Sequence, residues 1–379
     1  MAAFGAAISE HPTASFAVGE VVGSVLEQVG EAPDVALVFV AGHPAGSVDD
    51  IADAIRTLLQ PGVLAGSSAV AVIGGDLEAE DGPAISLWAG RVGPAEAVRL
   101  ETIRAPEGTA VVGMPDDAAD GARTLILLSD PFSFPVDALT RAANDQYPHL
   151  RIVGGVASVP GGPGTNRLVL DGRVHDHGAV GVLLPAGLGE FTVVSQGCRP
   201  VGEPYIVTSS DENLIEGLAM RPPLDRLQEL VDGSDDEERA LLASGLHMGV
   251  VLDETASEFR RGDFLVRAIL GADQATGGLR IGDRAPVGTT VQFHVRDAAT
   301  ATEDLERLLT MVDADAALVF TCNGRGQRLF EEPHHDASRV ADAVGRGPVA
   351  GMFCAGEIGP VSGQNHVHGF TASMLFLFG

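Results

Sequence analysis

The chain has 379 residues, of which 24 are basic and 52 acidic, and its formal net charge at pH 7 is −28. All 24 basic residues are arginine, which excludes chemistries that need a lysine amine, such as Schiff-base catalysis and the phosphate grip of a P-loop. A net charge this negative repels phosphate backbones and anionic headgroups, so we expect neither nucleic acid nor a membrane surface among the partners.

The distribution of charge and cysteine predicts a cytoplasmic protein. The first basic residue is Arg56, so the N-terminal segment lacks the positive charge of a signal peptide. No uncharged apolar run reaches the roughly 18 to 20 residues of a transmembrane helix. The three cysteines, Cys198, Cys322 and Cys354, are dispersed and odd in number, which favours thiols in a reducing compartment. Arginine without lysine, with abundant alanine, glycine and valine, is typical of a GC-rich bacterial genome.

The first predicted unit begins and ends with a strand. Residues 34–39 form a short apolar run of the kind that is buried on both faces of a sheet. A glycine-bearing loop follows at Gly42, and branched apolar residues four apart predict a helix around 51–55. The chain returns through the glycine-rich segment 64–75, and an apolar strand at 84–88 ends the unit.

A weaker copy of this unit follows, and a different kind of segment comes after it. The second copy has a strand at 124–128, a helix at 136–144 and a return with a final strand between 152 and 184. Beyond it, short strands alternate with glycine turns up to residue 295, which predicts a largely antiparallel α+β insert. Within this insert, the N-cap residue types at 209–211 predict the start of a helix.

The third copy lies near the C-terminus and matches the first copy best. Its first strand is predicted at 315–320, and its return segment 349–360 aligns without a gap with 64–75, with four of twelve positions identical. A strand, a helix and a second strand connected in this way form a parallel crossover. The predicted fold class is therefore α/β, with three repeated β-α-β-β units forming mixed sheets and an α+β, largely antiparallel insert between the second and third units.

Several segments of the chain resemble a known family. They are Cys322-Asn323-Gly324-Arg325-Gly326, the run from Gly351 to Pro360, the run from His368 to Ser373, the run from Gln196 to Gly202 and the run from Gly262 to Arg267. Together they resemble FIST proteins, whose name joins F-box and intracellular signal transduction. The resemblance covers nearly the whole chain and divides it into a FIST N-terminal-like domain, 1–220, and a FIST C-terminal-like domain, 221–379.

The resemblance implies a sensory module that binds small ligands such as amino acids. No kinase, cyclase or F-box segment is found in the chain, so we expect a stand-alone sensor that acts in signal transduction. Its expected partners are a small, amino-acid-like ligand and a signalling protein, and no cofactor is expected.

The predicted ligand site lies in the loops beyond the carboxyl ends of the strands, where open α/β sheets bind ligands. In the loop after 315–320, Arg325 lies between two glycines and can present a planar fork to a carboxylate, while Arg328 is expected to face solvent. The alternative is that Arg325 makes a surface ion pair and the glycines only form turns. The candidate ligand-binding residues are Asn323, Arg325, Gly326, Cys354, Glu357, Asn365 and His368.

Two other chemistries compete with this site, a zinc site and a thiol enzyme. Cysteine and histidine side chains, together with the run 334–336, could be drawn as zinc ligands, but no pair has the local spacing of a zinc site, so no metal is expected. Cys354 with His366 or His368 as a base would make a thiol enzyme, whereas the apolar setting of Cys354 favours a packed thiol. No catalytic residue is therefore assigned, and a protein-interaction scaffold without a ligand is the main alternative function.

Overall fold

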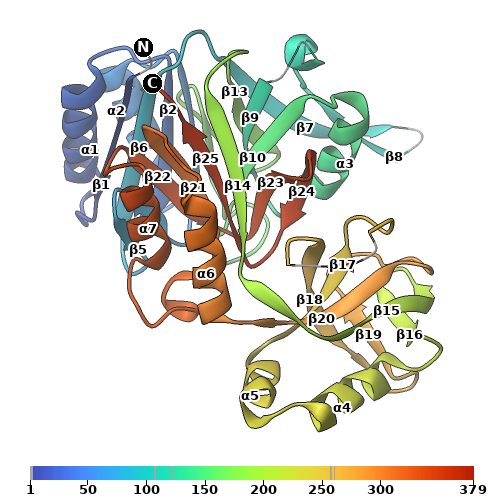
Figure 1. The fold of residues 1–379 in the computed structure, drawn as a ribbon. Coiled ribbons are helices and arrows are strands. Elements are labelled where there is room, and N and C mark those ends of the chain that lie inside the picture. Colours follow the sequence, from blue (N-terminus) through green and yellow to red (C-terminus); the bar gives the residue numbers. More distant parts are fainter. Residues whose placement is uncertain (1–2, 106–107, 120, 122, 257, 260) are drawn as a thin grey trace. The chain divides into compact units, whose positions relative to one another are not determined.

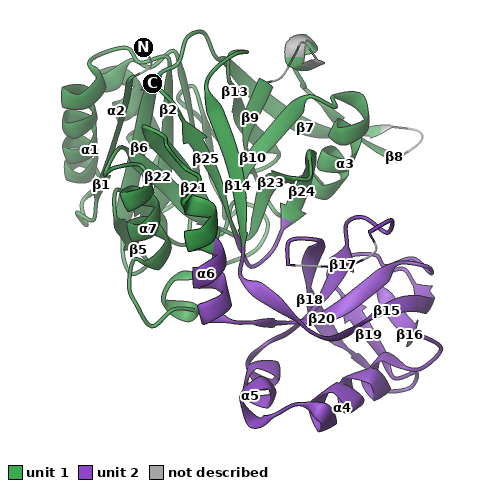
Figure 2. Ribbon diagram, in the orientation of Figure 1, with its two compact units in different colours: residues 1–195, 305–367, 372–379 green, residues 196–304, 368–371 purple. Residues whose placement is uncertain are grey.

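The computed structural model describes residues 3–105, 108–119, 121, 123–256, 258–259 and 261–379 (Figure 1). The chain forms two compact units (Figure 2). Unit 1 contains Met1–Ser195, Leu305–Val367 and Ala372–Gly379, and unit 2 contains Gln196–Asp304 and His368–Thr371. This division differs from the sequence-based domains 1–220 and 221–379, because unit 1 takes segments from both. Among the described residues, no helix has the length and apolar character needed to cross a membrane.

Unit 1 contains three mixed sheets, and the first is built mainly from the N-terminal segment. In spatial order its strands are β1 (Ala3–Ser9), β6 (Ala84–Arg91), β2 (Val35–Ala41), β3 (Val63–Ala69), β11 (Leu168–Leu170) and β12 (Arg173–His175). β2 and β3 are parallel and are joined by α2 (Ser47–Leu59), whose Ile51, Ile55 and Leu59 are buried on one face. That face and α1 (Ala14–Val29) pack on one side of the sheet (Figure 1).

The second sheet also has two parallel strands at its centre, joined by a helix. Its strands, in spatial order, are β24 (Gln364–His368), β23 (Gly356–Val361), β10 (Leu150–Val156), β9 (Arg123–Ser129), β13 (Ala179–Leu183), β7 (Glu96–Ala105) and β8 (Gly108–Val112). α3 (Val136–Gln146) joins the parallel strands β9 and β10, and a short 3-10 helix, η1 (Asp116–Ala119), precedes β9.

The third sheet carries the C-terminal segment. Its strands, in spatial order, are β14 (Glu190–Gln196), β25 (Thr371–Leu377), β21 (Ala316–Cys322), β22 (Val349–Cys354), β4 (Val72–Gly74) and β5 (Leu77–Ala79). The connection between the parallel strands β21 and β22 contains η2 (Gly326–Arg328) and α7 (His335–Ala343). α6 (Ala298–Leu309) precedes β21 and includes the point at which the chain passes from unit 2 to unit 1.

The outer hairpins are exchanged between the three sheets. Each sheet has a parallel pair at its centre, and the hairpin that follows the pair in sequence joins a different sheet. Thus β4 pairs with β22, β11 pairs with β3, and β23 pairs with β10, all antiparallel. The predicted mixed α/β character is confirmed, whereas superposition of the three segments stays a prediction.

A single internal core joins the three sheets of unit 1. Phe39 of β2, Leu128 of β9 and Phe320 of β21 all belong to it, and the rings of Phe39 and Phe320 pack edge to face with centroids 6.0 Å apart. Separate apolar clusters lie between the sheets and the helices: α1 and α2 cover the first sheet, α3 the second, and α6 and α7 the third. The first strand of each central pair, β2, β9 or β21, is therefore buried on both faces, as the apolar runs in these strands predict.

Unit 2 is a closed barrel of six strands. Their order is β15 (Cys198–Asp211), β16 (Leu214–Leu218), β19 (Gly278–Ile281), β18 (Phe264–Asp273), β17 (Leu246–Val251) and β20 (Thr290–Arg296), and every pairing is antiparallel. α4 (Pro223–Gly233) and α5 (Asp236–Ser244) follow β16. The expected antiparallel character of this segment is thus observed, although closure into a barrel was not predicted.

The prediction that a helix starts at 209–211 is wrong. These residues are the last part of β15, and Ser210 and Asp211 pair with Ile215 and Leu214 of β16. Glu212 adopts a left-handed φ of 52° in the turn between the two strands. Serine and aspartate are favoured at a helix N-cap and also in a tight turn. Here the backbone hydrogen bonds between β15 and β16 stabilise the turn.

Candidate functional site

The loop that leaves β21 lies against a hairpin from the other end of the chain. Gly326 has a φ of 57°, and a Cβ atom at this position would lie 2.6 Å from both carboxylate oxygens of Glu80. The same carboxylate accepts a hydrogen bond from the backbone N–H of Gln327, at 3.0 Å. Only glycine satisfies both the backbone conformation and the close approach, which explains the glycine that follows Arg325 in the sequence.

Arg325 is buried and its fork is already paired. Its side chain is 1% exposed; Nε donates to Asp336 Oδ2 at 2.7 Å, and Nη2 donates to Asp336 Oδ1 at 2.8 Å. Burial raises the pKa of the Asp336 carboxyl, but the charge and hydrogen bonds of Arg325 outweigh burial and hold the pKa well below its usual range. Among the described residues, the buried Nη1 of Arg325 has no hydrogen-bond partner. The alternative that Arg325 makes an ion pair is therefore observed, but in the interior and not at the surface.

Other groups complete this buried polar network. Thr321 Oγ1 donates to Asp336 Oδ2 at 2.7 Å, and His335 Nδ1 lies 2.9 Å from Asp336 Oδ1. The His335 ring stacks on Phe330, and the Arg325 guanidinium lies 5.1 Å from the centroid of the Phe330 ring. The loop is thus held by packing as well as by charge.

Glu78 of β5 caps the first turn of α7. Its Oε1 accepts the backbone N–H groups of Asp336 and Ala337, both at 2.9 Å, while Oε2 is buried without a partner among the described residues. Burial is the largest cause that raises the pKa of Glu78 to about 8, and the negative charge of Asp336 adds to it. Glu78 is therefore mostly protonated at neutral pH.

A polar cavity of about 210 Å³ opens beside this network, within unit 1. Arg328 contributes a positive charge to its lining, and Glu80 and Asp81 contribute negative charges. Arg328 is exposed, as predicted, and its Nη1 donates to the backbone oxygen of Asn323 at 3.4 Å. The complete lining is Val70, Ala71, Glu80, Asp81, Asn323, Gln327, Arg328 and Phe353.

Cys354 and Glu357 lie close to the same loop but are buried. The backbone N–H of Asn323 donates to the Cys354 carbonyl at 2.8 Å, and both Cys354 and Glu357 have no exposed surface. Burial, followed by the charge of Glu357, raises the pKa of the Cys354 thiol well above its usual value. The charge of Glu357 also interacts with Arg325. The structure thus brings five of the seven candidate residues into one region.

Of the seven candidates, Asn323 is the one that lines the cavity, and Asn365 and His368 are held by other parts of the fold. Asn365 Oδ1 accepts the backbone N–H of Ile152, and its Nδ2 donates to the Leu150 carbonyl, both at 2.8 Å. These contacts tie β24, the edge strand of the second sheet, to the backbone at the start of β10, although β23 lies between the two strands in the sheet order. His368 is assigned to unit 2 and is buried.

Sequence reasoning missed the residues that arrive by the exchanged hairpin. Glu78 and Glu80 come from the first repeat, and no pattern in the chain indicated that this hairpin would join the third sheet. The sequence offers Asp336 only as a metal ligand, whereas in the structure it pairs with Arg325, eleven residues earlier. Within the described part of the chain, no cluster of three or more His, Cys, Asp or Glu side chains could hold a metal ion.

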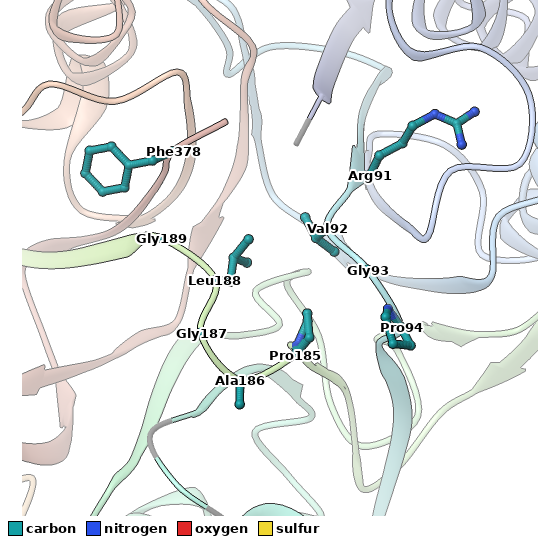
Figure 3. Close-up of a pocket in the computed structure, with 10 residues that line it drawn as sticks. All are labelled: Arg91, Val92, Gly93, Pro94, Pro185, Ala186, Gly187, Leu188, Gly189 and Phe378. Atoms are coloured by element: carbon teal, nitrogen blue, oxygen red, sulfur yellow. The ribbon is translucent and has the colours of Figure 1, made fainter. Parts of the chain in front are cut away.

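A second cavity, of about 420 Å³, lies where β6, β13 and β25 end (Figure 3). Its charged residue is Arg91, whose guanidinium donates to the carbonyl of Val29, the last residue of α1, and to the carbonyl of Ala32. The rest of the lining is apolar or glycine: Val92, Gly93, Pro94, Pro185, Ala186, Gly187, Leu188, Gly189 and Phe378. This cavity offers a polar ligand fewer groups than the cavity beside Arg325.

Comparisons with known proteins agree with the resemblance seen in the sequence. Residues 34–220 match the FIST N domain, and residues 223–360 match the FIST C domain. Uncharacterized proteins of Mycobacterium bovis and Mycobacterium tuberculosis are 42% identical to the chain over 378 residues, which is 98% of this chain and 97% to 98% of theirs. The chain therefore belongs to the FIST family, whose domains are sensory domains of signal transduction.

Proposed function

We propose that the protein is a cytoplasmic sensor that binds a small, amino-acid-like ligand in the polar cavity beside Arg325 and acts in signal transduction. The observation that supports this proposal is that charges of both signs line one cavity, since Arg328 faces the same space as Glu80 and Asp81. An amino acid carries one carboxylate and one ammonium group, which these side chains complement.

The size of the cavity favours a metabolite. Its volume of about 210 Å³ is below the roughly 300 to 1,000 Å³ of pockets that take drug-sized ligands. In this proposal Arg328, whose Nη1 donates to the Asn323 backbone oxygen, binds the ligand carboxylate through its other guanidinium N–H groups, and Asn323 supplies an amide beside it. Arg325 is a positioning residue, because its ion pair with Asp336 fixes the loop that carries Asn323 and Arg328.

A thermal-shift screen of amino acids and related metabolites tests the proposal first. A ligand at 100 times its dissociation constant stabilises the folded protein by roughly 2.7 kcal/mol, which is a measurable shift in melting temperature. No shift with any member of this class would contradict the amino-acid-like ligand.

Calorimetric titration of two variants then locates the site. Arg328→Ala removes a charge-assisted contact worth about 1.5 to 3 kcal/mol, so the dissociation constant should rise roughly ten- to a hundredfold. Arg173→Ala, at an exposed arginine of β12, is the matched control and should leave the affinity unchanged. An unaffected Arg328→Ala, or an equal loss in both variants, would move the site elsewhere.

The alternatives differ in their support. A thiol enzyme that uses Cys354 on a substrate is disfavoured, because the Cys354 side chain has no exposed surface at which a substrate could meet it. A scaffold would contact a signalling partner protein through its surface, and unit 2 exposes the apolar side chains Ile206 and Met220. A ligand-independent partner complex that survives Arg328→Ala would support the scaffold.

A further inference from the structure

Two thiols face each other across the centre of the third sheet. Cys322 is the last residue of β21 and Cys354 the last residue of β22, and the two are direct partners in the parallel register. Neighbouring strands lie about 4.7 to 4.9 Å apart, which falls within the roughly 4.4 to 6.8 Å between the Cα atoms of disulfide-linked cysteines. The backbone therefore already has the spacing that a disulfide requires.

Both side chains lie on the same face of the sheet. Leu318 and Phe320 of β21, and Met352 and Cys354 of β22, belong to the internal core of unit 1. Because side chains alternate along a strand, Cys322 continues the positions of Leu318 and Phe320 on that same face. The charges of the two sulfur groups interact, which agrees with this placement.

The two thiols have different surroundings. The backbone N–H of Gly324 donates to Cys322 Sγ at 3.4 Å, and the positive charge of Arg325 interacts with the Cys322 sulfur. Both contacts place positive charge or a polar hydrogen next to the Cys322 sulfur. Cys322 keeps 5% exposure next to Asn323, which lines the polar cavity, whereas Cys354 has no exposed surface. Cys322 is thus suited to react first and Cys354 to follow.

We propose that Cys322 and Cys354 form a redox site that closes to a disulfide on reaction with hydrogen peroxide. The Cys322 thiolate attacks one peroxide oxygen, the O–O bond breaks, and the leaving hydroxide takes a proton to become water. The Cys354 thiol then gives up its proton as its sulfur attacks the Cys322 sulfenic acid; the S–O bond breaks and a second water leaves. The two thiols lose two electrons and the peroxide gains them.

The oxidised pair would bear on the polar cavity. Asn323 follows Cys322 and Phe353 precedes Cys354, and both residues line that cavity. A disulfide between the two strand ends would therefore fix the spacing of two lining segments. The redox site itself does not depend on the identity of any ligand or on the proposed sensor function.

Peptide mapping of the full chain tests this inference. The folded protein is treated with a small excess of hydrogen peroxide, remaining thiols are alkylated, and the chain is digested without reductant. Mass spectrometry should find a peptide pair linked through Cys322 and Cys354, lost on treatment with dithiothreitol, and an alkylated Cys198. No link in the folded protein, or a Cys198 link of equal yield, would overturn the proposal.

Three variants separate the roles of the cysteines. Cys354→Ala should abolish the link and leave a Cys322 sulfenic acid that dimedone traps. Cys322→Ala should abolish both the link and the trapping, and Cys198→Ala, the matched control, should form the link as the unchanged protein does. Circular dichroism establishes that each variant is folded. If dimedone labels Cys354 in Cys322→Ala as fast as it labels Cys322 in Cys354→Ala, the assigned order of reaction is refuted. If the Cys198→Ala variant loses the link, the pairing of Cys322 with Cys354 is refuted.

Discussion

The buried carboxyl of Glu78 links the stability of unit 1 to pH. Its pKa in the folded chain is about 8, compared with 4.5 for an ordinary glutamate, so the unfolded chain releases the proton at lower pH than the folded chain does. The free energy of unfolding must then fall as the pH rises from 4.5 to about 8. Burial lowers the pKa values of His247 and His294 from 6.5 to about 4. These two groups make the free energy of unfolding rise with pH, but only below about pH 6.5, so they do not affect the pH range near 8.

The Glu78→Gln variant isolates this effect. Between about pH 7 and about pH 8, the unchanged protein should lose stability in urea unfolding, whereas Glu78→Gln should lose much less, because it has no proton to release. Glu10→Gln, at an exposed glutamate, is the control and should behave as the unchanged protein. Equal slopes for all three proteins would show that Glu78 is not the group that titrates.

Arg325 and Arg328 are three residues apart and should differ sharply in their effect on stability. Arg325→Ala leaves the buried Asp336 carboxylate without its charged partner, and breaking a buried ion pair in this way costs about 3 to 5 kcal/mol. Arg328 is exposed, so its loss should change the free energy of unfolding by no more than about 0.5 kcal/mol. Urea denaturation of both variants measures the difference, and similar values would mean that the buried pair adds little.

At the scale of elements, the chain predicts its long buried strands better than its short ones. The runs at 34–39, 124–128 and 315–320 correspond to β2, β9 and β21, because continuous apolar sequences have few alternatives to a buried strand. The helix predicted at 209–211 failed because turn and N-cap share the same residue types. β1 and α1 were not predicted at all.

The candidate site was partly predictable because one of its loops follows a long buried strand. A loop with an arginine between two glycines after a buried strand marked Asn323 to Gly326 as a place for close backbone approach. Glu78 and Glu80 lie on or beside β5, a strand of three residues whose sheet is completed by residues near the other end of the chain. A strand of three residues is too short to show a periodic pattern of apolar residues, and its pairing with a distant segment cannot be read from the residues around it.

At the scale of the whole molecule, the exchanged hairpins predict which pieces of the chain fold alone. A fragment of residues 1–220, the FIST N-terminal-like domain, lacks β23 beside β10 and leaves β4 without β22. It should give no cooperative unfolding transition in urea, because two strand edges remain open. A fragment of residues 196–304 holds every strand of the barrel and should unfold cooperatively. Cooperative unfolding of the first fragment would show that the sheets close without the exchange.

The exchange of hairpins also bears on how the protein is made. The hairpin of β4 and β5 leaves the ribosome long before β22, its partner in the third sheet, has been synthesised. At about 5 to 20 residues per second, the delay is on the order of tens of seconds, during which the nascent chain exposes unpaired strand edges. Chaperones should therefore hold the growing polypeptide until β22 has been made, and a prematurely terminated product, whose β4 has no partner strand, should be a target for degradation.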